Sequence, residues 1–382
     1  MAKYSDIKGF TVQTLSTDTI VSQFAGGSWS SGGSLNTARQ DFSGLGSQTA
    51  AFAVGGFVSP AGTTNVEQYN GTSFTETTDL NGAITANAAT GTTTAGISFG
   101  GAQPPSSVRD TTEVWNGTSW TEVNELNTAR STLAAGGTST AALGATGATN
   151  TALVTNTESW NGTSWTEVND VNLARAALAG FGTQSNLLIA GGDPTPKPNT
   201  ELWDGSSWTE VTDINTARGQ LKGSGIYTSG IIFGGYDAPT LYANTESWNG
   251  TSWTEVNDMA TARRKLGSAN TSATAALAFG GGVPSTTTTA TEEFTAPAVF
   301  NQITEGQLYF NSTTNTFKET ILDLAEATWA SGGSLNTARR RLVGTGLQTA
   351  ALALNGIPPS PGISNVVEQY DGSSWTEVAE AN

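Results

Sequence analysis

The most constraining feature of this chain is an aromatic residue that recurs every 43 to 46 residues, with one longer interval near the C-terminus. It stands at Trp29, Phe74, Trp120, Trp165, Trp208, Trp253, Trp329 and Trp375. Ten residues after each of the first seven comes Arg39, Ile84, Arg130, Arg175, Arg218, Arg263 or Arg339. Sixteen residues later lies a Gly-Gly pair or its remnant, and a second aromatic follows. Tandem units of this length predict a repeat architecture in which neighbours bury one another's apolar faces.

Each unit is predicted to form four short antiparallel strands. The stretch TESWNGTSWTEV (Thr157–Val168) holds the third and fourth, and its Asn-Gly predicts a hairpin with a type I′ turn. A small-residue strand follows the arginine, and an apolar strand ends in the glycine pair. One such sheet cannot bury its apolar face alone, whereas several arranged radially can. The pattern therefore predicts an all-β protein, and specifically a β-propeller.

The combination of an arginine, an apolar strand closed by Gly-Gly and two spaced aromatics resembles the kelch repeat, from Trp29 to Val378. A second resemblance lies outside the repeats. Tyr4–Asp18, Glu305–Glu319 and the SGGSLNTAR at Ser31–Arg39 and Ser331–Arg339 are similar to segments of virion proteins of tailed bacteriophages, cyanophages and other marine phages above all. This resemblance implies a structural protein of a phage particle, in its tail, fibre or capsid.

The number of blades depends on which strand closes the ring. The sequence has seven sets of the first three strands but eight fourth strands. We expect seven blades, with Trp329 completing the sixth and Trp29 or Trp375 the seventh. In the alternative, Trp29 completes the sixth blade, and a six-bladed ring carries an appended C-terminal module. The expected segments are an N-terminal arm (1–28), blades one to six (29–294), an inserted hairpin (295–328) and a final blade that closes the ring (329–382).

Charge and composition exclude several classes of function. The formal net charge is −16, which disfavours binding to nucleic acids and anionic membranes. The chain contains no His and no Cys, so the commonest general base and the commonest transition-metal ligands are missing. It has neither an apolar run of about 18 residues nor a signal-peptide pattern. We therefore expect no nucleic-acid partner, no membrane insertion, no metal and no cofactor.

The repeated glutamates are expected to be structural rather than catalytic. They stand on the third strands (Glu67, Glu113, Glu158, Glu201, Glu246, Glu368) and the fourth strands (Glu76, Glu122, Glu167, Glu210, Glu255, Glu377). Acid–base catalysis needs one or two carboxylates in distinct environments, and a group present in nearly every blade belongs to the architecture. We expect ion pairs with the repeated arginine, which should also hydrogen-bond between neighbouring blades. No catalytic residue is assigned, and the protein is expected not to be an enzyme.

Sequence variation locates the candidate binding surface. Nearly all differences in unit length fall between the Gly pair and the third strand, in loops that share one face of a propeller. Variable loops on a rigid scaffold are where recognition usually occurs. The candidate contact residues in these loops are Arg109, Lys197, Tyr236, Asp237 and Tyr242.

The interruption of one hairpin marks a second candidate. Phe294 and Trp329 are separated by 35 residues where other units have five, which is an insertion of 30 residues. The insertion carries its own predicted hairpin, with the apolar residues Leu308, Phe310 and Phe317. Together with the N-terminal arm it is the expected attachment element, because extended arms add strands to a neighbour's sheet.

We therefore expect a non-enzymatic virion protein that mediates assembly and meets the host surface. Its partners would be other virion proteins, further copies of the chain, and a host-surface glycan or protein. The alternatives are a glycan-degrading tail enzyme (a depolymerase) and a soluble kelch interaction module.

Overall fold

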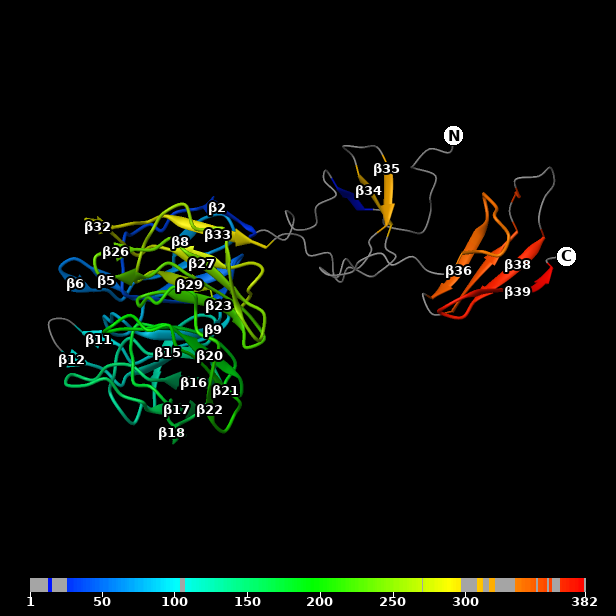
Figure 1. The fold of residues 1–382 in the computed structure, drawn as a ribbon. Coiled ribbons are helices and arrows are strands. Elements are labelled where there is room, and N and C mark those ends of the chain that lie inside the picture. Colours follow the sequence, from blue (N-terminus) through cyan, green and yellow to red (C-terminus); the bar gives the residue numbers. More distant parts are fainter. Residues whose placement is uncertain are drawn as a thin grey trace. The chain divides into compact units, whose positions relative to one another are not determined.

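The computed structural model describes residues 13–15, 26–103, 107–269, 271–296, 308–311, 316–319, 334–347, 350–355, 357–358 and 365–380. The chain divides into two compact units, Ser16–Gln302 and the combination of Met1–Leu15 with Ile303–Asn382 (Figure 1). The described residues form strands and no helix, so the predicted all-β class is confirmed. Consequently no helix that could span a membrane is found among them.

The unit Ser16–Gln302 holds six four-stranded antiparallel sheets in its described residues, numbered here sheet 1 to sheet 6. Their strands are β3, β4, β7 and β8 (Ser43–Ser47, Ala50–Val54, Val66–Tyr69, Phe74–Glu76); β9, β10, β13 and β14 (Ala88–Thr92, Ala95–Phe99, Thr112–Trp115, Trp120–Val123); β15 to β18 (Ala134–Thr138, Ala141–Ala145, Thr157–Trp160, Trp165–Val168); β19 to β22 (Ala179–Gly182, Leu187–Ala190, Thr200–Trp203, Trp208–Val211); β23, β24, β27 and β28 (Lys222–Ile226, Ser229–Phe233, Thr245–Trp248, Trp253–Val256); and β29, β30, β33 and β2 (Gly267–Ala269, Leu277–Phe279, Thr291–Thr295, Ser28–Gly32).

A circle of backbone hydrogen bonds joins these six sheets. Just before the first strand of each sheet, one non-glycine residue has a φ of 53 to 57°, a left-handed conformation that is unusual for such residues. Each donates its N–H to the carbonyl of the corresponding residue of the preceding sheet, at 2.6 to 3.0 Å. The circle runs from Asp41 to Lys265, Gln220, Ala177, Thr132, Ala86 and back to Asp41. The sheets therefore follow one another in closed cyclic order, which is compatible with a β-propeller.

The strand that completes sheet 6 comes from the N-terminal side of the chain. Ser28–Gly32 (β2) pairs antiparallel with Thr291–Thr295 (β33), and Trp29 lies opposite Phe294. The Trp29 indole N–H also donates to Thr245 Oγ1 of sheet 5 at 3.1 Å. This pairing belongs to the six-bladed alternative. The expectation that Trp329 completes the sixth blade is therefore corrected, because Trp29 occupies that place.

Buried apolar clusters lie between consecutive sheets. Between sheets 4 and 5, for example, Phe181 and Leu188 pack with Trp248 and Trp253. The two tryptophan rings are 5.1 Å apart, and both side chains are buried. The Trp253 indole N–H crosses back to Thr200 Oγ1 of sheet 4, at 3.2 Å. The repeated tryptophans are thus core residues between sheets, where each contributes a large apolar area.

The turns between the third and fourth strands differ in detail from the prediction. Trp160 pairs with Trp165, so the loop has four residues rather than two. Gly162 has φ 94°, but Asn161 is not among the described residues with positive φ, so the turn is not type I′. The Asn161 side-chain oxygen instead accepts the N–H groups of Thr163 and Ser164, both at 2.9 Å. Asparagine is needed here as a local hydrogen-bond acceptor.

The other unit contains two separate sheets. Gln13–Leu15 (β1) pairs parallel with Leu308–Asn311 (β34), which pairs antiparallel with Thr316–Glu319 (β35). The hairpin expected in the insertion is therefore present, and the N-terminal arm adds a strand to it. The C-terminal sheet consists of β36 to β39 (Val343–Leu347, Ala350–Leu354, Val366–Tyr370, Trp375–Glu380).

Candidate functional site

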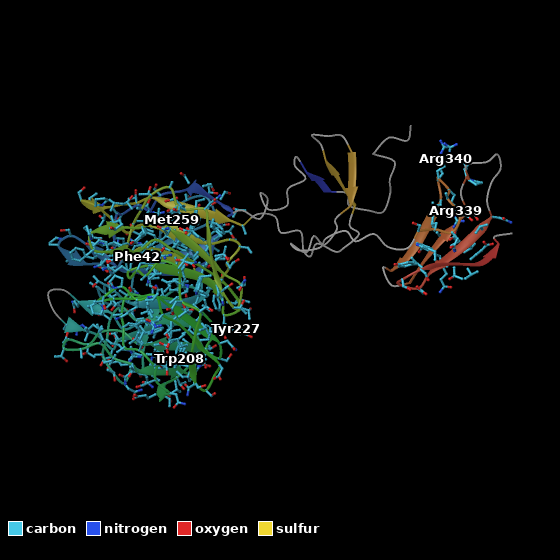
Figure 2. The ribbon with its side chains drawn as sticks, in the orientation of Figure 1. Phe42, Trp208, Tyr227, Met259, Arg339 and Arg340 are labelled. Carbon is cyan, nitrogen blue, oxygen red and sulfur yellow. The ribbon has the colours of Figure 1, made fainter. Side chains whose placement is uncertain are left out.

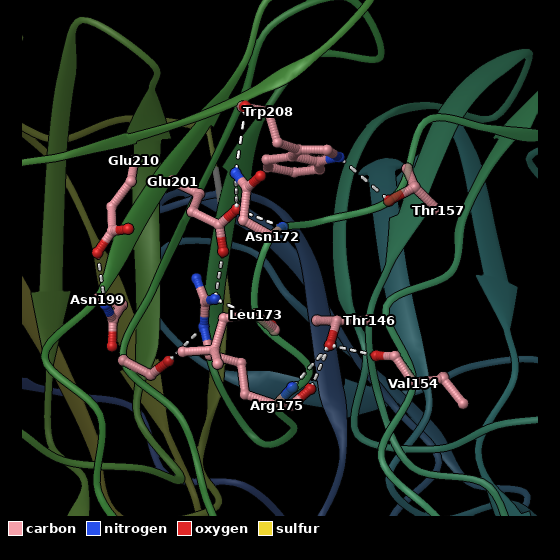
Figure 3. Close-up of polar contacts among 11 residues, drawn as sticks. Thr146, Val154, Thr157, Asn172, Leu173, Arg175, Asn199, Glu201, Trp208 and Glu210 are labelled. Atoms are coloured by element: carbon pink, nitrogen blue, oxygen red, sulfur yellow. Dashed lines mark hydrogen bonds and ion pairs between the residues drawn. The ribbon is translucent and has the colours of Figure 1, made fainter.

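A buried arginine–glutamate pair recurs in most of the sheets, and sheet 4 shows it with all its hydrogen bonds (Figure 3). Arg175 Nη1 is 2.5 Å from Glu201 Oε1, and Arg175 Nε donates to the Gly191 carbonyl at 2.9 Å. The other Glu201 oxygen, Oε2, accepts the backbone and side-chain N–H groups of Asn172, both at 2.8 Å. The carboxylate is thus fully occupied, as a buried charge requires.

The same pair recurs in most sheets. It joins Arg39 to Glu67, Arg130 to Glu158, Arg175 to Glu201, Arg218 to Glu246, Arg263 to Glu292 and, in the C-terminal sheet, Arg339 to Glu368. Figure 2 labels Arg339. The expected ion pairs are confirmed. The expected bond between neighbouring blades is made by the backbone instead: the Arg175 carbonyl accepts the Gly147 N–H of sheet 3 at 3.1 Å.

Sheet 2 is the one sheet of the ring in which this unit is incomplete. Ile84 stands in place of the arginine, and no ion pair is formed by the third-strand carboxylate of Glu113 among the residues that the structure describes. Glu113 is only 5% exposed. Its Oε2 accepts the Asn81 backbone N–H at 2.9 Å and the Asn81 side-chain N–H at 2.6 Å, and the glutamates of sheets 3, 4 and 5 accept the same two bonds. The carboxylate is therefore buried and oriented as elsewhere, but its charge is not neutralised.

A second partner is missing in the same sheet. In sheet 4, Glu210 of the fourth strand accepts the Asn199 side-chain N–H at 2.6 Å, and sheets 1, 3 and 5 have the same bond. In sheet 2, Thr111 replaces that asparagine, and the corresponding glutamate is Glu122. Glu113 and Glu122 are directly opposite each other on β13 and β14. Opposite residues of an antiparallel pair share one face of the sheet, so these two carboxylates are neighbours.

Both carboxylates line a cavity of about 200 Å³. Ile84, Ser98, Gly100, Gln103 and Arg109 complete much of its wall. Burial raises the pKa of Glu113 above its ordinary value, the two Asn81 hydrogen bonds oppose this shift, and the charge of Glu122 adds to it. Sheet 2 therefore contains an acidic cavity. In the other five sheets of the ring, an arginine pairs with the corresponding glutamate. The sequence carried a signal for this site, since Ile84 and Thr111 break two repeat rules within one unit.

The predicted loop residues gather in part on a second cavity. The loops between the Gly pairs and the third strands form four short hairpins on one side of the unit, at the left of Figure 1: β5–β6 (Phe57–Val58, Ala61–Gly62), β11–β12 (Ala102–Gln103, Ser107–Val108), β25–β26 (Tyr236–Asp237, Thr240–Leu241) and β31–β32 (Gly282–Val283, Thr286–Thr287). Tyr236 and Asp237 line an open cavity of about 300 Å³ together with Asp193. The Arg264 guanidinium carbon lies 4.2 Å from the centre of the Tyr236 ring, which fixes that ring in a cation–π contact.

The other candidate loop residues lie elsewhere. Arg109 lines the cavity of sheet 2, and its Nη2 donates to Gln103 Oε1. Lys197 and Tyr242 line neither cavity; their backbone N–H groups bond to Gly192 and Gly235, each at 3.0 Å. The five loop candidates therefore do not form one site.

The candidate attachment residues occupy the hairpin of the insertion. Phe310 pairs with Phe317 across β34 and β35, and Leu308 pairs with Glu319. On its other edge β34 meets the N-terminal strand, with Thr14 paired to Phe310. The N-terminal arm and the insertion thus join in one three-stranded sheet.

No protein-family model matches the chain, and no curated protein matches it either. Within the described residues, no three Asp or Glu side chains come together as ligands for a metal ion.

Proposed function

We propose that residues 26–296 form a six-bladed propeller of the kelch type, and that the chain is a non-enzymatic structural protein of a bacteriophage particle. The closed circle of backbone bonds and the arginine–glutamate pairs support the propeller. The particle assignment rests on the resemblance of Tyr4–Asp18 and Glu305–Glu319 to phage virion proteins. In this role the six sheets form a rigid scaffold that presents the loops. The unit made of Met1–Leu15 and Ile303–Asn382, called the second unit below, makes the contact with the particle.

The observation that carries this proposal is that the C-terminal sheet resembles the sheets of the ring, yet the apolar side chains on its faces are only partly buried. The C-terminal sheet repeats the register of sheet 1, with Ala351 opposite Tyr370 as Ala51 is opposite Tyr69. In sheet 1 the apolar residues of both faces are buried: Phe52, Val54, Tyr69 and Phe74. Their counterparts Leu352, Leu354, Tyr370 and Trp375 are only half-buried. A half-exposed apolar sheet face marks a surface for association with another protein.

The three-stranded sheet of the insertion supports the same role. β1 joins β34 in parallel although almost 300 residues separate them in the chain, since Gln13 pairs with Tyr309. Strand addition by an extended arm is a common way for one protein to bind another. We propose that this sheet and the C-terminal sheet are the attachment elements, and that the loop hairpins with Tyr236 and Asp237 face neighbouring proteins or host glycans.

The test is to locate the chain. We expect proteomics of purified virions to detect it at a fixed copy number, and a particle reconstruction to show the second unit against other virion proteins. Absence from purified virions would contradict the proposal and favour a soluble interaction module. Release of reducing sugar from host polysaccharide by the purified protein would contradict the non-enzymatic assignment and favour a depolymerase.

A further inference from the structure

The cavity of sheet 2 lies at the place where other sheets hold a guanidinium group. Ile84 Cγ1 lies close to Gly101, and in sheet 1 the Cδ of Arg39 lies close to the equivalent Gly56. The Ile84 side chain therefore occupies the space that the aliphatic part of the arginine side chain takes in sheet 1. An isoleucine side chain ends before the position of the guanidinium. The space beyond it is bounded by Glu113, Ser98 and Gly100.

The walls of this cavity carry the acceptors that bind guanidinium elsewhere in the ring. In sheet 1 the guanidinium of Arg39 bonds to Glu67 at 2.7 Å and to the Ala53 carbonyl at 3.3 Å. The residues at these two positions in sheet 2 are Glu113 and Ser98, which pair across β10 and β13. In sheet 5 the Arg218 Nε bonds to the carbonyl of Gly234, the first glycine of the Gly pair. Its equivalent in sheet 2 is Gly100, which also lines the cavity.

From this juxtaposition we propose that the cavity beside Glu113 binds a guanidinium group supplied from outside the chain. The source is either a free guanidinium compound or an arginine side chain of a partner protein. Arginine and carboxylate match as planar, two-point hydrogen-bonding groups, and this match is stronger in a desolvated site than in water.

The cavity also has an entrance for such a group. Gly82 stands two residues before Ile84, where the other units have a threonine or leucine two residues before the arginine, and a Cβ built at Gly82 would meet no atom within 4 Å. Glu122 is exposed and extends the acidic wall outward. Arg109 is the one basic residue that lines the cavity among the described residues, and its Nη2 is engaged by Gln103. Two carboxylates against one arginine leave the recess net negative.

Other ligands fit this lining less well. Calcium takes six to eight oxygen ligands, and no group of three acidic residues is present here in the described part of the chain. No aromatic ring lines the cavity among the described residues, so a sugar has no stacking surface. The proposal does not depend on the phage assignment.

The test is calorimetric titration of the full chain with N-acetyl-arginine amide, with the neutral citrulline analogue as the matched ligand. We expect a dissociation constant of about 1 mM or below, since a single charged group in a small site is a weak ligand. Glu113→Gln should weaken binding at least about tenfold, because it removes a charge-assisted hydrogen bond. Ile84→Arg should abolish binding, because it restores the arginine of the other sheets and fills the cavity.

Two results would overturn the proposal: equal binding of the citrulline analogue, or undiminished binding to Ile84→Arg. If Ile84→Arg does not fold, Gly82→Thr replaces it, since threonine has space there and should narrow the entrance and weaken binding. Affinity should also rise as the pH is raised through the pKa of Glu113, and a flat profile would contradict the role of this carboxylate. An arginine-containing peptide that binds tighter than the free amide assigns the site to a protein partner, whereas equal affinity assigns it to a free ligand.

Discussion

At the scale of single residues, the ring depends on charges that are buried and paired. Arg175 is fully buried, and its only ion-pair partner in the described residues is Glu201, which is 1% exposed. Removing one member of a buried pair is far more costly than replacing both, because the remaining charge stays desolvated. We expect Arg175→Met to lower the free energy of unfolding by about 3–5 kcal/mol.

The measurement is chemical denaturation of the Arg175→Met and Glu201→Gln variants and of the double variant. The double variant should recover much of the loss, since it leaves no buried charge unpaired. A loss in the double variant equal to the sum of the two single losses would show that Arg175 and Glu201 stabilise the ring independently of each other, and not through the ion pair.

Glu113 is the residue at which this pairing fails, and its pH dependence follows from its environment. Its pKa in the folded protein lies above the ordinary value of 4.5, chiefly because of burial. Between these two pKa values the folded protein binds more protons than the unfolded chain, so this residue's contribution to stability falls as the pH rises. We expect Glu113→Gln to lose less stability than the wild type when the pH is raised from 4.5 to neutrality. Thermal unfolding across this range measures the difference, and parallel curves for the two proteins would contradict the raised pKa.

At the scale of elements, β2 determines whether the ring is closed. Trp29 lies 5.1 Å from Phe233 of sheet 5 and 5.2 Å from Phe294 of sheet 6, measured between ring centres, so it joins two sheets. Because Trp29 is only half-buried, we expect Trp29→Ala to cost about 2–3 kcal/mol, slightly less than for a fully buried tryptophan. Protease digestion should also cut the ring faster, since β2 loses its ring contacts with sheets 5 and 6 and detaches more often. The matched control is Trp329→Ala, which should leave the stability of the ring unchanged. A larger loss of stability for Trp329→Ala than for Trp29→Ala would contradict closure by β2 and favour the seven-bladed arrangement.

The elements themselves could be predicted from the sequence, and the closure could not. Four strands per unit, the tryptophan core and the arginine–glutamate pair are all properties of one repeat, so each copy provides the same information again. The closure of the ring depends on which of two similar segments completes sheet 6. Trp29 and Trp329 begin almost identical segments, and either could lie opposite Phe294. The cavity of sheet 2 could not be predicted from the repeat, because it depends on two departures from the repeat, Ile84 and Thr111, whose positions only the fold brings to the same cavity.

At the scale of the whole molecule, the two units should differ in how they respond to the same substitution. Phe52 of sheet 1 is fully buried and contacts Trp115 of sheet 2, with ring centres 5.5 Å apart. Leu352 holds the same register position in the C-terminal sheet but is half-buried. We expect Phe52→Ala to destabilise the ring by about 3–5 kcal/mol, because it leaves a cavity between two sheets. Leu352→Ala should cost only about 1–2 kcal/mol and should leave the unfolding of the ring unchanged.

Differential scanning calorimetry of both variants checks this difference, because units with separate cores unfold in separate transitions. Phe52→Ala should lower the larger transition alone, and Leu352→Ala the smaller one alone. The same pair of variants separates stability from assembly in infected cells. If the C-terminal sheet is an attachment element, Leu352→Ala should reduce the copy number in virions although the ring remains folded. Normal incorporation of this variant, together with an unchanged smaller transition, would show that the exposed face of this sheet takes no part in particle contact.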